Sequence, residues 1–417
     1  MAVDVAPLPS SFRRLWASDA LSTAGDGFTL VAAPLLALTL TDDPTLVALT
    51  TTAQFLPWMV FGLLSGALVD RYEPRRLIIG VDLVRGLLFV VLAVAVWTHH
   101  VDVGLLYAVL FLSGAGDTVT STAATSLTPR LVERDQLTRA NSRLLSTRLI
   151  GGSLVARPLG AVLFLHGPGT PFAVDAVSFG LGCLLLVGVP SGLHGRADRA
   201  AAGTVPGPVA PPSAPVRPRV RDGLAMLWAD PVLRILALCI LVMNVTLAAT
   251  MSVLVLVARD RLGLGAFGYG LLLAALAAGG LIGTVVVRPL LARFGPATLL
   301  TAGLVIEAAT HLGLALTRSP WLAGGVLVVF GVHAAVWSVL TLSLRQHRIE
   351  DSARGRVGSA YQMLSVGGAA LGGVLGGLLV ETVGLTAPMW FGAVVVALVF
   401  AVAVRSLRSS AIELGHA

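Results

Sequence analysis

The stretch GALVDRYEPRRL, from Gly66 to Leu77, sets the interpretation of the whole chain. It crowds five charged side chains between two long apolar segments, namely Asp70, Arg71, Glu73, Arg75 and Arg76. Charges enter hydrocarbon only at a high cost in free energy, whereas they are common in the short loops that join membrane-spanning helices. The stretch therefore predicts a tight turn at a membrane surface between two transmembrane helices.

The composition also places the chain in a membrane. Of its 417 residues, 56% are hydrophobic and 12% are charged, and the mean hydropathy is +0.87. Soluble globular proteins carry about 25% charged residues, so this chain lacks the polar surface to face water. The net charge of +7 is not interpreted as a nucleic-acid footprint, because the positions of the arginines follow the membrane topology.

Other kinds of chemistry are not indicated. Cys183 and Cys239 both lie inside apolar runs, which is typical of buried thiols. The chain has no G-x-x-x-x-G-K-[ST] motif for a nucleotide, no clustered metal ligands, and no nucleophile with a base at a useful spacing. We therefore expect a protein that is not an enzyme, with no cofactor, no metal site and no nucleic-acid partner.

Twelve segments are long and apolar enough to cross a bilayer, which takes about 20 residues. They cover residues 14–40, 45–69, 76–97, 103–127, 142–165, 171–190, 232–257, 267–292, 297–317, 320–344, 358–380 and 386–404. The segment 191–220 is rich in Pro, Gly and Ala, as expected of a flexible linker. We predict an all-α membrane protein with a six-helix bundle over 1–190, a linker over 191–220 and a second six-helix bundle over 221–417.

The arginines gather in alternate connections between these segments. The opposite connections hold only Arg259, Arg261 and Arg318. Since arginine is concentrated in the cytoplasmic loops of membrane proteins, this asymmetry predicts that both termini and the linker are cytoplasmic. The arginine-rich connections contain Arg13, Arg14, Arg71, Arg75, Arg76, Arg130, Arg134, Arg139, Arg143, Arg293, Arg345, Arg348, Arg354, Arg356, Arg405 and Arg408.

The two halves of the chain share short similarities. DRYEPRR, from Asp70, aligns with ARFGPAT, from Ala292, at an offset of 222 residues. At an offset of 216, three glycines of the fifth segment align with three of the eleventh: Gly151, Gly152 and Gly160 with Gly367, Gly368 and Gly376. Because both matches fall in corresponding parts of the two halves, they favour an internal duplication.

The charged loop carries a family likeness. Gly66, Asp70, Arg71, Arg75 and Arg76 resemble the signature loop of the major facilitator superfamily, with Glu73-Pro74 in place of the more usual Gly-Arg. VDLVRGLL, LVERDQLTRANS, VDAVSFGLG and RDGLAMLWADPVLR are similar to the branch that contains bacterial drug and siderophore exporters. The chain departs from the usual pattern of drug and proton antiporters at two positions. Arg157 replaces a small residue in the fifth span, and Asp117 in the fourth span takes the place of a basic residue.

The resemblance implies a fold of two pseudo-symmetric six-helix bundles that work by alternating access. It implies a monomer in the bacterial inner membrane that exports small amphipathic molecules, drug-like or siderophore-like, in exchange for protons. An importer or facilitator of the same fold, or a membrane sensor that transports nothing, remains an alternative. The resemblance also implies that the loop of Gly66, Asp70, Arg71, Arg75 and Arg76 latches onto the start of the eleventh helix, although the loop is also explained as a positive anchor.

Charged residues inside the spans are the candidate functional residues, because by default they face a cavity or a partner. Asp26 lies about nine residues into the first span and is predicted to carry a proton, unless it bonds Ser22 or Thr23 or caps a kink. Asp117 is a second candidate proton carrier and is expected to pair with Arg148. Arg157 is interpreted as a contact for a substrate, as a counter-charge for Asp26, or as structural.

Other polar residues in the spans are weaker candidates. Asn244, His333, Gln54 and Gln362 lie in spans that, by resemblance, border the central cavity, and they are predicted substrate contacts. Asp82 and Arg85 are three residues apart, and Glu307 and His311 are four apart. Such spacings place both members of a pair on one helix face, so we interpret both pairs as local and structural.

Overall fold

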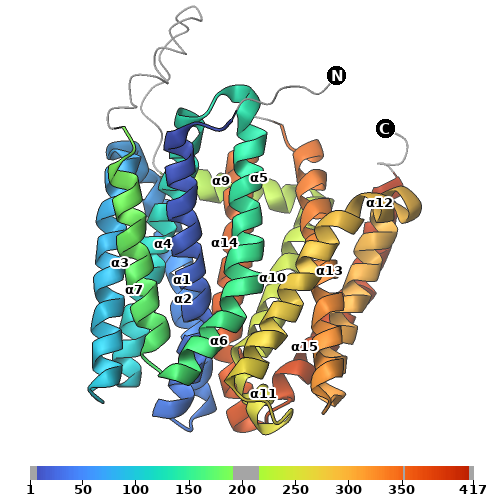
Figure 1. The fold of residues 1–417 in the computed structure, drawn as a ribbon. Coiled ribbons are helices and arrows are strands. Elements are labelled where there is room, and N and C mark those ends of the chain that lie inside the picture. Colours follow the sequence, from blue (N-terminus) through green and yellow to red (C-terminus); the bar gives the residue numbers. More distant parts are fainter. Residues whose placement is uncertain (1–6, 191–215, 351–352, 413–417) are drawn as a thin grey trace, which may run out of the picture. The chain divides into compact units, whose positions relative to one another are not determined.

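The computed structural model describes residues 7–190, 216–350 and 353–412, which are mostly helical and contain no β-strand (Figure 1). The first half contains α1 (Ser10–Leu40), α2 (Pro44–Arg71), α3 (Pro74–Trp97), α4 (Val103–Leu131), the 3₁₀ turn η1 (Arg134–Gln136), α5 (Leu137–Ser146), the π-helix η2 (Thr147–Val155), α6 (Ala156–His166) and α7 (Thr170–Val187). The second half contains α9 (Val216–Ala229), α10 (Pro231–Ser252), α11 (Leu254–Asp260), α12 (Ala266–Leu316), α13 (Pro320–Arg348), α14 (Arg354–Thr382) and α15 (Ala387–Ile412).

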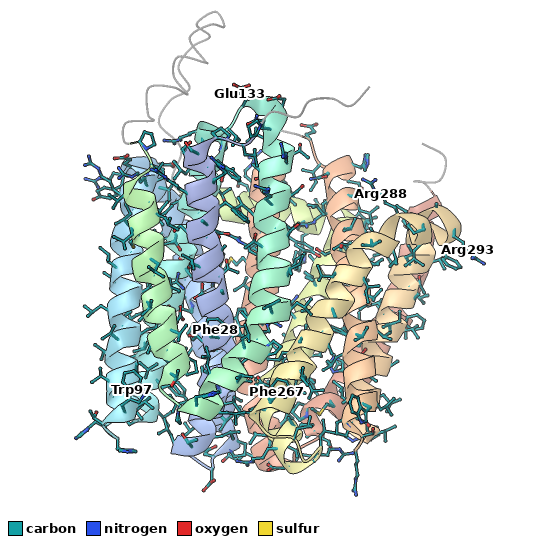
Figure 2. All side chains as sticks on the ribbon, viewed as in Figure 1. Phe28, Trp97, Glu133, Phe267, Arg288 and Arg293 are labelled. Atoms are coloured by element: carbon teal, nitrogen blue, oxygen red, sulfur yellow. The ribbon has the colours of Figure 1, made fainter. Side chains whose placement is uncertain are left out.

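These helices provide the twelve predicted crossings. Ten helical segments of the described chain are long and apolar enough to span a membrane, and the apolar stretch Ala387–Val402 of α15 adds another. The 51-residue helix α12 counts twice, because Gly295, with φ of 71°, bends it into two arms (Figure 1). Figure 2 shows Arg288 and Arg293 near this bend and Phe267 at the far end of the helix. The all-α fold with twelve membrane-spanning helices is confirmed.

The chain forms two compact units. The first unit comprises residues 1–32 and 60–213, and the second comprises residues 33–59 and 214–417. Most of the predicted 191–220 linker lies outside the described residues, and α9 begins within it at Val216. The division into bundles over 1–190 and 221–417 stays a prediction.

The charged loop between α2 and α3 is a tight turn, as predicted. Asp70 and Arg71 end α2, and Pro74 starts α3 at a position where its missing N–H costs no hydrogen bond. Arg75 donates from Nε to the Leu186 carbonyl and from Nη2 to the Val187 carbonyl, both at 2.8 Å. These carbonyls lie in the last turn of α7, where Leu186 also accepts from the Val189 N–H at 3.0 Å, so Arg75 adds a cap to that helix from outside.

Within each half, a glycine allows two helices to pack closely together, and the helix pairs correspond. A Cβ at Gly160 of α6 would lie 2.7 Å from Phe28 Cα of α1, a residue labelled in Figure 2. A Cβ at Gly376 of α14 would collide with the Ala249 carbonyl of α10. Gly160 and Gly376 are one of the aligned glycine pairs, so the repeated sequence corresponds to a repeated helix contact.

The fifth span is not a regular α-helix. Thr147–Val155 adopts the π-helix η2, and Pro158 follows three residues later in α6. Proline removes one backbone donor and clashes with the preceding turn, so a wider winding just before it has a local cause. In a straight α-helix Arg148 and Arg157, nine residues apart, would point in opposite directions, but this span is not a straight α-helix.

Replacing Gly160 with Ala should destabilise the first unit, because the new methyl group would overlap the α1 backbone at Phe28. Overpacking of this kind costs about 1–3 kcal/mol. The measurement is the midpoint of thermal unfolding of the purified protein in detergent.

Gly180→Ala is the matched control, since a Cβ at Gly180 of α7 meets nothing within 4 Å. This substitution should be neutral or raise stability by up to about 1 kcal/mol through the lost flexibility of the unfolded chain. Equal unfolding midpoints for the two variants would show that the glycine contact is unimportant.

Candidate functional site

Arg85 is the centre of an ion cluster in the first unit. The side chain is 2% exposed, and its Nη2 lies 2.6 Å from Asp26 Oδ1. Its Nη1 lies 3.7 Å from Asp82 and 3.9 Å from Asp117, and its Nε donates to Ser113 at 3.2 Å. Helices α1, α3 and α4 thus each send a carboxylate to one guanidinium.

The carboxylates around Arg85 differ in their access to solvent. Asp82 is 5% exposed, whereas Asp26 and Asp117 are each 36% exposed. The guanidinium also lies over the Phe179 ring, 4.4 Å from its centroid, which closes its other face. Arg85 and Asp82 are therefore the buried part of the cluster, and Asp26 and Asp117 are the part that water and solutes can reach.

Two interpretations of these residues need correction. The Asp82–Arg85 pair is present, but it is not merely local, because Arg85 makes its shortest contact with Asp26. Arg85, and not Arg157, is therefore the counter-charge of Asp26, and no hydrogen bond to Ser22 or Thr23 is needed. The spacing of three residues predicts only the partner on the same helix, because the contact of Arg85 with α1 depends on how α1 and α3 pack.

The predicted pair of Asp117 and Arg148 does not form. Arg148 Nη2 lies 3.0 Å from Asp19 Oδ1 of α1, and Asp117 faces Arg85. The reason is that α4 packs along α3, so its inward side chains meet that helix first. Arg157 is half-buried in the first turn of α6, just after η2.

Asp175 of α7 is a buried carboxylate that the sequence analysis did not single out. It is fully buried, and it accepts a hydrogen bond of 2.6 Å from the Thr29 hydroxyl of α1. A Cβ at Gly25 would collide with it, so glycine makes room for this side chain between α1 and α7. Asp175 could have been identified from the sequence as a candidate, because it is a charged residue about six positions inside an apolar span.

The second unit has a buried cluster of its own, centred on Glu307 of α12. Glu307 Oε2 lies 3.1 Å from His333 Nε2 of α13, and Glu307 Oε1 lies 3.7 Å from His311 Nε2. The other ring nitrogen of His311 lies 3.0 Å from the Thr250 hydroxyl of α10. As with Asp82 and Arg85, the spacing of Glu307 and His311 predicted the pair on one helix, whereas the contact with His333 depends on how α12 and α13 pack.

The two clusters occupy corresponding positions in the repeat. Glu307 follows Arg85 by 222 residues, the offset of the charged loops, and His333 follows Asp117 by 216, the offset of the glycines. The first unit therefore places a cation among carboxylates where the second places a carboxylate among imidazoles.

A cavity of about 250 Å³ lies beside Glu307, entirely within the second unit. Three of the predicted substrate contacts, Asn244, His333 and Gln362, line it together, whereas Gln54 of α2 does not. The remaining lining residues are Ile240, Met243, Leu247, Glu307, Phe330, Ala334, Trp337, Ser338, Thr341, Arg345, Tyr361 and Ser365. Among the described residues, no group of three or more His, Cys, Asp or Glu is arranged to hold a metal ion.

The loop residues expected to form a latch are only partly engaged within their own unit. Arg75 caps α7, and Arg76 lies 2.8 Å from Glu73 while remaining 76% exposed. Asp70 and Arg71 are exposed at the end of α2. Within its own unit, a Cβ added at Gly66 would meet no neighbouring atom. The latch stays a prediction.

Comparison with known proteins identifies the family. The sequence pattern of the Major Facilitator Superfamily matches residues 15–372. This chain belongs to the major facilitator superfamily. Its membership confirms the family likeness of the charged loop and the predicted fold class.

Similar proteins include exporters. The enterobactin exporter EntS of Salmonella paratyphi A is 27% identical over 414 residues, which cover 95% of this chain and 93% of that protein. The macrolide efflux protein A of Streptococcus pyogenes is 29% identical over 128 residues, 31% of this chain and 32% of that protein. This superfamily chain is a multi-pass membrane transporter with exporters among its relatives, and the superfamily is not a class of enzymes.

Solved structures share the fold. A bacterial homologue of the iron transporter ferroportin, in an inward-facing state, has a TM-score of 0.70 at 19% identity, covering 94% of this chain and 97% of that one. The nucleoside transporter NupG has a TM-score of 0.74 at 12% identity, covering 95% and 98%. At these identities the likeness concerns the fold alone.

Removing the central cation should destabilise the first unit more than removing a peripheral one. Arg85→Gln leaves carboxylates near a buried site without their partner, which typically costs about 3–5 kcal/mol. Arg148→Gln breaks a pair whose arginine is 45% exposed, and such pairs contribute about 0–1 kcal/mol. The measurement is the thermal unfolding midpoint of each purified variant.

The double variant Arg85→Gln/Asp82→Asn provides the control. It removes the buried carboxylate along with the buried cation, so it should recover part of the lost stability. If Arg85→Gln is no worse than Arg148→Gln, or if Asp82→Asn adds a further loss, the cluster is not held together by its charges.

Proposed function

We propose that this transporter exports small amphipathic molecules in exchange for protons by alternating access. The supporting observation is the charge balance of the Arg85 cluster. Three carboxylates lie within 4 Å of a single guanidinium at membrane depth. One cation cannot neutralise three carboxylates where water is scarce, so the site needs further positive charge, and protons are its simplest source.

The exposure of the carboxylates assigns their roles in this proposal. Asp26 and Asp117 exchange protons with the aqueous pathway, because each is partly exposed. Arg85 and Asp82 are buried and hold the cluster together. A proton on Asp26 weakens its attraction to Arg85, so protonation changes how strongly α1 is tied to α3. Coupling of this kind lets a proton bias one conformational state over another.

The direction of transport is proposed from the relatives. The names of two similar proteins describe export of enterobactin and efflux of macrolides. Together with the arginine distribution, this supports a monomeric exporter in a bacterial inner membrane with both termini in the cytoplasm. Arg148, Arg157, Asn244, His333, Gln54 and Gln362 are proposed to contact the substrate.

Transport into proteoliposomes tests the proposal, with enterobactin and a macrolide as probes. An antiporter accumulates substrate when the lumen is more acidic than the outside, because protons leave as substrate enters. A symporter shows the opposite dependence, and a facilitator shows none. Accumulation only with an acidic exterior, or equal movement in empty liposomes for both probes, would overturn the proposed export.

Asp26→Asn should uncouple transport from protons without blocking it. Asparagine keeps the size of the side chain and still offers an oxygen to Arg85, so the fold is preserved, but it cannot take up a proton. Accumulation driven by the pH gradient should fall to the level of empty liposomes, while exchange of internal for external substrate continues. The measurement is radiolabelled substrate uptake under both conditions.

Asp102→Asn is the matched control, because Asp102 caps the start of α4 and asparagine caps helices equally well. This control should keep wild-type accumulation. Persistent pH-driven accumulation by Asp26→Asn would assign the proton to another residue.

The predicted latch has a separate test. Asp70 is exposed and is proposed to join the cytoplasmic latch implied by the family resemblance. Asp70→Asn should therefore lower the transport rate while the amount of folded protein in the membrane stays normal. Unchanged transport rates, measured at equal protein levels, would contradict the latch and show that the loop serves only as a positively charged anchor.

A further inference from the structure

Two polar side chains lie together on the wall of the second unit's cavity. Trp337 and Tyr361 are 4% and 5% exposed, and both line the cavity. The Tyr361 hydroxyl lies near the side chains of Trp337 and Thr341, although it makes no hydrogen bond of full geometry in the described structure.

Arg345 adds an uncompensated positive charge to the same cavity. Its guanidinium lies over the Tyr361 ring, 3.7 Å from the centroid, and its Nε donates to the Thr341 carbonyl at 3.2 Å. Neither contact is a carboxylate, and no described acid lies within ion-pair distance of this half-buried side chain. Arg85 and Arg148, by contrast, both pair with aspartates.

The negative charge of the cavity lies at its other end. His333 and Arg345 are twelve residues apart on α13, which corresponds to about 18 Å along the helix. Glu307 is engaged by His333 and faces His311 at the first end. It therefore does not oppose an anion at the Arg345 end.

Aromatic rings form part of the cavity wall. Trp337 and Phe330 both contact His333 edge to face, with centroid distances of 6.0 and 5.9 Å, and Tyr361 contributes a third ring. The volume of about 250 Å³ is below the range of about 300–1,000 Å³ typical of whole drug-sized ligands. The cavity thus suits one ring-bearing group of a substrate.

We propose that this cavity binds an aromatic anion, with its negatively charged oxygens at Arg345 and the Tyr361 hydroxyl and its ring against Trp337. The proposal rests on the transport function above and names the class of substrate, but direct binding tests it without any transport.

Binding of 2-naphthoate to the purified full-length protein is the test, measured by titration calorimetry. The anion should bind, while 2-naphthamide, which keeps the ring and loses the charge, and cyclohexanecarboxylate, which keeps the charge and loses the aromatic ring, should bind at least about tenfold more weakly. Equal binding of all three compounds, or no binding of naphthoate, would overturn the proposal.

Three variants locate the site. Tyr361→Phe removes the hydroxyl and keeps the ring, and Trp337→Phe replaces the indole of the cavity wall with a smaller ring; each should weaken naphthoate binding about tenfold. Arg345→Gln should abolish the preference for naphthoate over naphthamide. Trp390→Phe is the matched control, since Trp390 of α15 is 44% exposed and does not line the cavity. Unchanged naphthoate binding in all three cavity variants would overturn the assignment.

Stability separates a ligand site from packing. Tyr361→Phe keeps the ring and removes only a hydroxyl that makes no hydrogen bond of full geometry in the described structure, so it should change the unfolding midpoint little without ligand. Weaker binding by this variant with undiminished stability supports the site. Weaker binding only in step with a lower unfolding midpoint would show that the hydroxyl is structural.

Discussion

The pairing of Arg85 is the interaction on which the first unit depends. A guanidinium that is 2% exposed in a membrane-spanning helix must have anionic partners, because neither lipid nor water can stabilise it there. Asp26, Asp82 and Asp117 satisfy this requirement from three different helices. The cluster therefore does two things at once. It fixes α1 and α4 against α3, and it concentrates more acid than the single cation can balance. The first effect belongs to folding, and the second supports the proposed exchange for protons.

The second unit has a central group of opposite charge at the corresponding position. Glu307 stands 222 residues after Arg85, and His333 stands 216 after Asp117, so both halves keep polar groups at these positions. A buried polar group needs hydrogen-bonding partners whatever its charge. Imidazoles from α12 and α13 serve Glu307, as carboxylates serve Arg85. The two units therefore differ chemically on a shared framework: the first has more acids than its one cation balances, and the second has an arginine on its cavity with no described acid beside it.

Local features of the sequence predicted the fold well, but they did not predict the contacts between helices. The length and hydropathy of each span are local properties, so the sequence alone predicted the twelve crossings, the turn at Pro74 and the aligned glycines Gly160 and Gly376. The partner of a charged side chain depends on how each helix is rotated and which helix lies beside it. That is why Asp26 was identified without Arg85, Arg148 was assigned to Asp117 and not to Asp19, and His333 was not linked to Glu307. The π-helix at Thr147–Val155 changed the phase of the fifth span in a way that a straight-helix rule cannot anticipate.

The contrast between Arg85 and Arg345 bears on how a transporter separates stability from binding. A cation that serves the fold is surrounded by protein acids, as Arg85 is, and no solute can replace them cheaply. A cation that serves a ligand must keep its donors available, and the fold then carries the cost of leaving them unsatisfied. Arg345 fits this second pattern in the proposed site, since it lines the cavity and has no described acid within ion-pair distance. Since a carrier must release what it binds, a few donors on a small cavity suit it better than a fully enclosing site, because moderate affinity permits both capture and escape.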